Sequence, residues 1–216
     1  MQAKTTFVGE MVDAGVLAFG DFTLKSGLNS PYFFNLGNIS SGRTLANLGY
    51  VFAKYIYDLN LAPDILFGPA YKGIPLATAT AIALSDMRQV VRVAFNRKER
   101  KEHGEGTNLM GAELDSARVL LLDDVVTDGA TKAEAYDMIR ANNGNPIGVL
   151  VALDRRELDP TGQRTMLQAL EIKLDTPVYS IATLEDILMF LEHREMDHEY
   201  ATIREYADRH CLLKLT

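Results

Sequence analysis

The sequence predicts an α/β fold in which a central parallel sheet is flanked by helices. Short continuous runs of Val, Ile and Leu recur along the chain and alternate with segments of helical periodicity. This alternation is typical of parallel sheets that are covered on both faces. The 216 residues suffice for one ample core and hardly for two, so we expect a single domain over residues 1–216.

The N-terminal part is expected to contain one helix, two short strands and a second helix. Residues 5–19 place apolar side chains at helical spacing and predict a helix. Residues 22–24 and 32–36 resemble short strands, and the turn-rich sequence SGLNSP separates them. A helix over 43–59 follows the cap candidate Ser41.

A regular alternation follows from residue 64 onward. We expect helices over 72–86 and 130–142, one or two closing helices over 184–210, and strands over 64–70, 89–95, 119–126, 146–154 and 176–182. The alternation fails between residues 95 and 119, where about twenty residues lack periodicity. A long irregular connection inside a compact domain is usually functional or disordered.

Composition limits the classes of partner. Hydrophobic residues make up 47% and charged residues 24%, which is ordinary for a soluble protein. No apolar run approaches the roughly 18 residues of a membrane helix, so we expect no membrane partner. The net charge of −7 argues against nucleic acid as a partner. The single cysteine, Cys211, excludes an internal disulfide and favours a cytoplasmic location.

Two adjacent carboxylates end the most apolar of the expected strands. Asp123 and Asp124 follow the run VLLL, and the loop TDGAT then leads into a helix. Ligands of open parallel sheets bind outside the carboxyl ends of the strands. The N–H groups at that helix start, with the hydroxyls of Thr127 and Thr131, form a seat for phosphate. The acids are placed for sugar hydroxyls or a metal, although Asp124 or Asp128 capping the helix is the simpler alternative.

The irregular segment supplies the opposite charge. Five basic side chains lie close together there: Arg97, Lys98, Arg100, Lys101 and His103. The glycines that follow would let the segment open and close as a lid, and its cations could neutralise a pyrophosphate. The alternative is a solvated loop whose charges partly cancel against neighbouring glutamates.

Two further segments bring candidate side chains toward the same edge. GPAYKGIP follows an expected strand and puts Tyr71 and Lys72 at its carboxyl end, although a lone lysine there is often merely exposed. FTLKSGLNSPYFFN carries Lys25, Phe33 and Phe34. Adjacent aromatic residues are commonly strand core. Because neighbouring strand residues face opposite sides, one of the two can still face a ligand.

Together these segments resemble the orotate phosphoribosyltransferases, a branch of the type I phosphoribosyltransferase family. The loop DDVVTDGAT is similar to the motif that binds 5-phosphoribosyl 1-pyrophosphate (PRPP), and it indicates the class. The branch is indicated by FTLKSGLNSPYFFN, GPAYKGIP, RKERKEHGEG and ALDRRE, which span residues 20–157 in the order and spacing of the family. The resemblance implies a type I phosphoribosyltransferase fold with a small N-terminal hood, mainly residues 1–40, and a long flexible lid loop.

The resemblance also implies the reaction, the cofactor and the partners. Orotate and PRPP would give orotidine 5′-monophosphate and pyrophosphate during the synthesis of UMP. The cofactor would be Mg²⁺, held mainly through PRPP and water rather than by a certain protein ligand. The enzyme would be a homodimer in which lid residues reach the neighbouring subunit's site. The alternatives are a phosphoribosyltransferase for another base and a non-catalytic PRPP-binding regulator, which the acidic net charge disfavours.

The site residues implied by the resemblance fall into three groups. The catalytic groups would be Lys101, His103, Asp123 and Asp124. PRPP would contact Lys25, Tyr71, Lys72, Arg97, Lys98, Lys101, His103, Asp123, Asp124, Val125, Val126, Thr127, Asp128, Gly129, Ala130 and Thr131. Orotate would contact Phe33, Phe34, Thr127 and Arg155, and the guanidinium fork of that arginine matches the carboxylate of orotate.

The phosphate loop departs from the family in one respect. The common pattern after the two acids is T-A-G-T-A, and this chain has T-D-G-A-T. Either Thr131 reaches back to the phosphate or backbone N–H groups carry more of the binding. Asp128 adds a carboxylate beside the expected phosphate seat.

Overall fold

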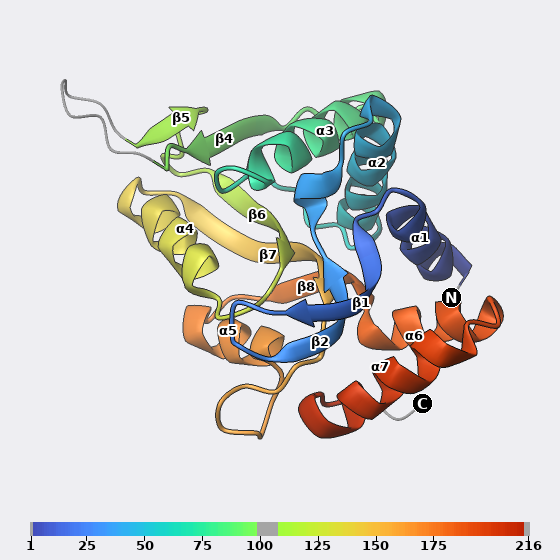
Figure 1. The fold of residues 1–216 in the computed structure, drawn as a ribbon. Helices are drawn as coiled ribbons and strands as arrows, with labels where there is room; N and C mark the ends of the chain where they lie inside the picture. Colours follow the sequence, from blue (N-terminus) through green and yellow to red (C-terminus); the bar gives the residue numbers. More distant parts are fainter. Residues whose placement is uncertain (1, 99–107, 214–216) are drawn as a thin grey trace.

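A six-stranded sheet forms the centre of the computed structural model, which describes residues 2–98 and 108–213 (Figure 1). The strand order is β5-β4-β3-β6-β7-β8. The bounds are β3 (Ile65–Phe67), β4 (Arg92–Asn96), β5 (Leu109–Gly111), β6 (Arg118–Val125), β7 (Asn145–Asp154) and β8 (Val178–Thr183). Neighbouring strands are parallel except for β4 and β5. The predicted parallel sheet is therefore confirmed, with one short antiparallel strand at its edge.

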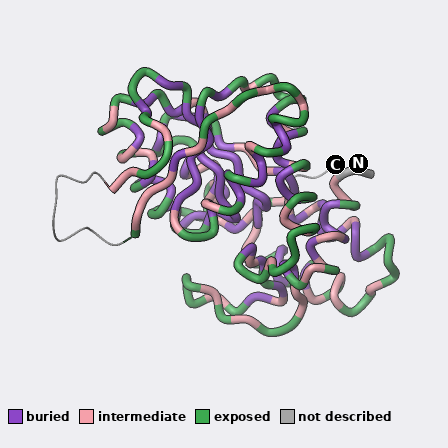
Figure 2. The backbone as a smooth tube through the Cα atoms, turned by 90° about the horizontal axis from the view of Figure 1, so that it is seen from above, coloured by how far each residue is buried: buried purple, intermediate pink, exposed green. Residues whose placement is uncertain are grey.

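Helices cover both faces of this sheet. The core on one face packs beneath α2 (Gly42–Asp58), α3 (Gly73–Asp86) and α6 (Leu184–His193), and the other core packs beneath α4 (Ala130–Ala141) and α5 (Met166–Leu174). Strand β6 alternates between them, because Leu120 and Leu122 join the first core while Val119 and Leu121 join the second. Figure 2 shows the buried residues gathered along the central segments. Burial on both faces explains why these strands read as continuous apolar runs.

A separate hairpin stands beside the main sheet. β1 (Leu17–Thr23) and β2 (Asn29–Phe34) pair in antiparallel register, after α1 (Gln2–Asp13) and before the short 3-10 helix η1 (Leu36–Asn38). The last helix, α7 (Asp197–His210), contacts β2 (Figure 1). The β1–β2 hairpin thus bridges the carboxyl edge of the main sheet and the C-terminal helix.

The expected helix over residues 5–19 is wrong in its second half. The helix ends at Asp13, and Gly15 takes a φ of 66°. The N–H of Val16 then bonds the carbonyl of Met11 at 2.9 Å, so the chain reverses at a glycine turn of the kind that commonly ends helices. Phe19 therefore lies on β1, although it continues the helical spacing of apolar residues.

Three elements were not anticipated, and one of them is the short 3-10 helix η1. Helix α5 begins with a capping box in which Thr165 accepts from the N–H of Gln168 and the Gln168 side chain accepts from the N–H of Thr165. Strand β5 has only three residues and lies within the segment that lacked periodicity. Among the helices that the structure describes, none is long and apolar enough to cross a bilayer.

Candidate active site

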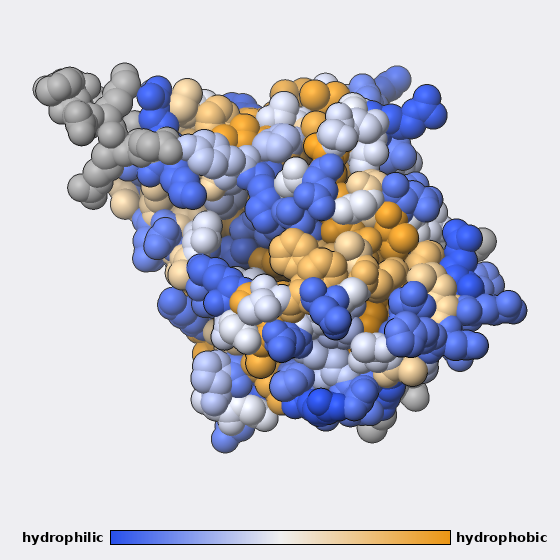
Figure 3. All heavy atoms as spheres, in the orientation of Figure 1, coloured by the Kyte–Doolittle hydropathy of each residue, from blue (hydrophilic) through white to orange (hydrophobic). Residues whose placement is uncertain are grey.

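A cavity of about 440 Å³ lies at the carboxyl edge of the sheet. Its walls come from the β1–β2 hairpin, the end of β6, the start of α4 and the segments that follow β3, β4, β6 and β7. The lining residues are Leu24, Lys25, Phe33, Phe34, Pro69, Ala70, Tyr71, Lys72, Lys98, Asp123, Asp124, Val125, Thr127, Thr131, Lys132 and Arg155. Figure 3 shows a hollow on this face with hydrophilic groups around it and an apolar cluster beside it.

Asp123 and Lys132 form a buried ion pair at this edge. Lys132 lies in the first turn of α4, and its Nζ is 2.5 Å from a carboxylate oxygen of Asp123. The side chain of Lys132 is 6% exposed and that of Asp123 is 10% exposed. Burial raises the pKa of Asp123, and the neighbouring charge of Asp124 acts in the same direction, whereas Lys132 opposes them.

Asp124 forms an ion pair with a different lysine, Lys72. The Nζ of Lys72, from the segment after β3, bonds the carboxylate of Asp124. Burial acts to raise the pKa of Asp124, but the hydrogen bond and charge of Lys72 outweigh it and lower that pKa. The two adjacent carboxylates therefore differ in electrostatic character, and Asp124 is the one held firmly as an anion.

The loop after β6 turns into α4 at a left-handed glycine. Gly129 has a φ of 70°, and a Cβ at this position would stand 3.0 Å from Cδ1 of Leu170. Glycine is thus needed here both for backbone conformation and for the close approach of α5. The Oδ1 of Asp128 accepts from the N–H of Ala130 at 3.0 Å in an Asx turn, whereas the N-cap of α4 is Gly129 and not Asp128.

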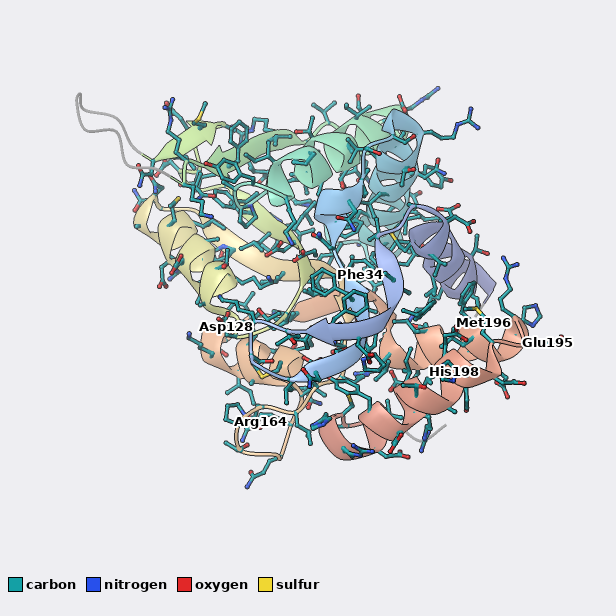
Figure 4. All side chains as sticks on the ribbon, in the orientation of Figure 1. Phe34, Asp128, Arg164, Glu195, Met196 and His198 are labelled. Atoms are coloured by element: carbon teal, nitrogen blue, oxygen red, sulfur yellow. The ribbon has the colours of Figure 1, made fainter. Side chains whose placement is uncertain are left out.

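Asp128 also links the loop to the β1–β2 hairpin. The Nζ of Lys25, in the hairpin turn, lies 3.0 Å from Oδ2 of Asp128, and both side chains are more than half exposed. The hydrogen bond from Lys25 lowers the pKa of Asp128. Figure 4 shows Asp128 beside the tip of the hairpin, with Phe34 further along it. Because Lys25 lines the cavity, this contact joins the cavity wall to the loop after β6.

The aromatic side chains of β2 face different surroundings. Phe34 is buried and belongs to the core, while Phe33 is 36% exposed and stacks on Phe22 with ring centroids 5.5 Å apart. Both line the cavity. Tyr71 is exposed on the opposite wall, and the Nζ of Lys98 lies 5.7 Å from its ring centroid.

Arg155 is a buried cation on the cavity wall. Its exposed fraction is 4%, and its Cζ lies 4.1 Å from the ring centroid of Tyr32. Nε donates to Oε1 of Glu157 at 2.8 Å, and Nη2 donates to Oγ of Ser30 at 2.9 Å. Desolvation acts to lower the pKa of Arg155, but Tyr32 and Glu157 outweigh it and raise that pKa, so the guanidinium keeps its charge.

Most of the predicted site residues thus meet in one cavity, and the remainder fall into three groups. Val126, Asp128 and Gly129 belong to the loop after β6 and Ala130 begins α4, and none of these four lines the cavity. Arg97 stands at the base of the irregular segment, where its N–H bonds the carbonyl of Asn108 at 2.7 Å. Lys101 and His103 lie outside the described residues.

Lys132 is the charged residue that sequence reasoning missed. The signal was present, because Lys132 follows Asp123 by nine positions in a strand, loop and helix unit. A lysine in the first turn of a helix is unfavourable beside the positive end of the helix dipole. Such a residue indicates an internal anionic partner.

Comparison with known proteins gives the class first. Residues 39–178 match the family model described as the phosphoribosyl transferase domain. With the parallel sheet and the acidic loop at its carboxyl edge, this match defines a phosphoribosyltransferase. A protein from Chromohalobacter salexigens named orotate phosphoribosyltransferase is 47% identical over 209 residues, which cover 94% of this chain and 89% of that one. The protein of that name from Enterobacter sp. is 46% identical over 204 residues and covers 94% and 95%.

A solved structure agrees with these relatives. The orotate phosphoribosyltransferase of Francisella tularensis has a TM-score of 0.84 and 32% identity, covering 96% of this chain and all of that one. The chain belongs to the orotate phosphoribosyltransferase family, whose members are pentosyltransferases of pyrimidine biosynthesis.

Proposed function

We propose that this protein transfers the 5-phosphoribosyl group from PRPP to a ring nitrogen of orotate in a reaction that depends on Mg²⁺. The products are orotidine 5′-monophosphate and pyrophosphate. The observation that carries the proposal is the convergence of three features in one cavity: the Asp123–Asp124 pair, the loop into α4, and the buried Arg155.

PRPP lies across the carboxyl edge in this proposal. Its 5′-phosphate occupies the loop from Thr127 to Thr131, because the first N–H groups of α4 and two threonine hydroxyls converge there. The ribose hydroxyls bond Asp123 and Asp124. Lys25, Tyr71 and Lys72 contact the remaining phosphate oxygens, and Lys25 must then leave Asp128.

Orotate occupies the part of the cavity between the aromatic residues of β2 and Arg155. Nε and Nη2 of Arg155 already have partners, so Nη1 is the nitrogen that we assign to the carboxylate of orotate. A guanidinium N–H placed in this way separates orotate from bases that lack a carboxylate. Phe33 and Phe34 offer apolar contact to the ring, and Thr127 offers a hydroxyl.

The donors fit Mg²⁺ that arrives with PRPP. Residues 2–98 and 108–213 contain no cluster of three His, Cys, Asp or Glu side chains able to hold a metal alone. Mg²⁺ commonly keeps several waters and binds through one or two carboxylates and substrate phosphates. Asp123 and Asp124 are the carboxylates that would help to hold Mg²⁺, which would neutralise charge on the pyrophosphate when bound.

The departure of pyrophosphate from PRPP determines which charges the other residues must stabilise. Positive charge develops on the ribose ring and negative charge on the leaving group. Asp123 and Asp124 hold the sugar, while Lys98, Arg97, Lys101 and His103 balance or protonate the pyrophosphate. Loss of one such interaction typically lowers the rate by roughly 100-fold or more. Exclusion of water by the segment that carries Lys101 protects the activated sugar from hydrolysis.

Turnover of orotate tests the proposal directly. The purified protein is mixed with PRPP, Mg²⁺ and orotate, and the loss of free orotate is followed by ultraviolet absorbance. Parallel reactions omit Mg²⁺ or replace orotate with uracil, adenine or hypoxanthine. We expect Mg²⁺-dependent turnover of orotate alone. Turnover of another base would favour a different phosphoribosyltransferase, and PRPP binding without any turnover would favour a regulator.

We also propose a cytoplasmic homodimer with shared lid residues and neither nucleic acid nor membrane as partner. We assign the second copy to a groove of about 660 Å³ between α2 and α3, which exposed Tyr50 and Ile82 help to line.

Lys101→Ala is expected to lower turnover strongly and leave the fold intact. Mixing it with Asp124→Asn subunits should restore some activity, whereas subunit exchange without recovery would contradict shared sites.

A further inference from the structure

The guanidinium of Arg155 is held by residues from both ends of the chain. Oε1 of Glu157, which accepts from Nε of Arg155, also accepts from the hydroxyl of Tyr206 at 2.7 Å. Tyr206 belongs to α7 and packs edge-on against Tyr32 of β2, with ring centroids 6.3 Å apart. Ser30 of β2 accepts from Nη2, the nitrogen that also lies 2.8 Å from Oε1 of Glu157.

Main-chain contacts tie the same two parts of the chain together. Glu157 pairs with Cys211 in an isolated antiparallel bridge. The N–H of Leu158 bonds the carbonyl of His210, and the N–H of Leu212 bonds the carbonyl of Arg156, both at 2.9 Å. The end of α7 therefore lies directly against the segment that carries Arg155.

A buried ion pair is not needed to pack this part of the core. Arg155, Glu157 and Tyr206 are all buried, and an ion pair in such surroundings loses hydration that its mutual attraction only partly offsets. The carboxylate of Glu157 also weakens the attraction of Arg155 for an anionic ligand. What the cluster provides is a single orientation, because Nε, Nη2 and the face of the guanidinium each have a partner. Because the guanidinium is planar, these partners also fix the direction in which Nη1 points.

We propose that Glu157 and Tyr206 are positioning residues that fix Arg155 for the carboxylate of orotate, so that α7 contributes to substrate selection without touching the substrate. This inference rests on the proposed function. Tyr206 acts on Glu157, Glu157 acts on Nε and Nη2 of Arg155, and Ser30 acts on Nη2 from the hairpin. The KM for orotate, rather than the KM for PRPP, is the quantity that this arrangement controls.

Tyr206→Phe is the primary test, because it removes one hydroxyl and changes no charge. Loss of a hydrogen bond to a charged group predicts a rise in the KM for orotate of roughly tenfold, with the KM for PRPP nearly unchanged. Ser30→Ala removes a second partner of Nη2 and should raise the same constant. Tyr200→Phe is the matched control, since it makes the same chemical change on α7 away from the cluster, and it should leave both constants unchanged.

The decisive comparison repeats Tyr206→Phe in an Arg155→Lys background. Lysine has no Nε–H to be positioned by Glu157, so Tyr206→Phe should there leave the KM for orotate unaltered. An equal effect in both backgrounds, an equal rise in the KM for PRPP, or no effect of Tyr206→Phe and Ser30→Ala would overturn the proposal. If the wild-type protein fails to turn over orotate, it is the proposed function that fails, and the variants are compared only after that turnover is measured.

Discussion

Substituting methionine for Lys132 should destabilise the protein more than any exposed lysine substitution. The Lys132–Asp123 pair is nearly inaccessible to solvent, so the magnitude that applies is that of a buried pair losing one partner, about 3–5 kcal/mol. For a chain of 150–250 residues, 1 kcal/mol shifts the thermal midpoint by roughly 2–4 °C. Lys132→Met should therefore lower the midpoint by roughly 6–20 °C at neutral pH.

The pH dependence of this loss has a definite sign. Without Lys132 the pKa of Asp123, which burial already raises, moves further up. The native state then binds a proton that the unfolded state would release, so the deficit is full above the folded pKa and shrinks as the pH falls toward the unfolded value. Differential scanning calorimetry at neutral pH and at about pH 5, each against wild type, measures this change.

Two companion variants make the experiment decisive. Asp123→Asn combined with Lys132→Met removes the stranded charge and should recover much of the lost stability. Lys54→Met breaks the exposed pair with Asp58 on α2 and should change the midpoint little. An unchanged midpoint in Lys132→Met, or a double variant no more stable than the single one, would refute the reasoning.

Three further predictions concern the loop after β6 and its lysines. Gly129→Ala forces a φ of 70° on a residue with a Cβ. Calorimetry should show a loss of stability of about 1–2 kcal/mol, and steady-state kinetics should show a higher KM for PRPP. An unchanged stability and an unchanged KM would contradict the requirement for glycine at this position. Asp128→Asn releases Lys25 and removes a negative charge beside the phosphate seat. The KM for PRPP should therefore fall several-fold at low salt. A rise in this KM would refute the idea that Asp128 competes with the phosphate for Lys25. Lys72→Met should destabilise the protein less than Lys132→Met because Lys72 is half exposed. Since the pKa of Asp124 is lowered from 3.8, this deficit should be present at neutral pH and should narrow below about pH 4, and acid titration of the thermal midpoint checks it.

Local patterns predicted the sheet because its strands are buried on both faces. The apolar runs of β6 and β7 and the acids that end β6 could be interpreted without knowledge of the tertiary structure. The end of α1 could not, because the apolar spacing continues through Gly15 and only the turn after Asp13 redirects the chain. Helix α5 was missed although its Thr165–Gln168 capping box is visible in the sequence.

The candidate site divides in the same way. Side chains at or shortly beyond the end of a strand, such as Asp123, Asp124 and Lys72, were placed correctly at the edge of the sheet because sheet geometry dictates it. The partners of Arg155 were not foreseen, since Ser30 and Tyr206 are separated from it by 125 and 51 positions. Such pairings depend on how the hairpin and α7 pack, which periodicity does not encode.

Pairing within the cavity makes binding an exchange of partners. Four cations around the site each have an internal carboxylate, in the pairs Lys25–Asp128, Lys72–Asp124, Lys132–Asp123 and Arg155–Glu157. These charges cancel at short range, so the pairs exert little attraction on a distant polyanion. At the three lysine pairs an arriving ligand must substitute its own oxygens for those of the protein, whereas Arg155 keeps Glu157 and offers Nη1. A ligand that matches only one cation gains little by this substitution, and one that presents anionic groups to several cations at once exchanges them together.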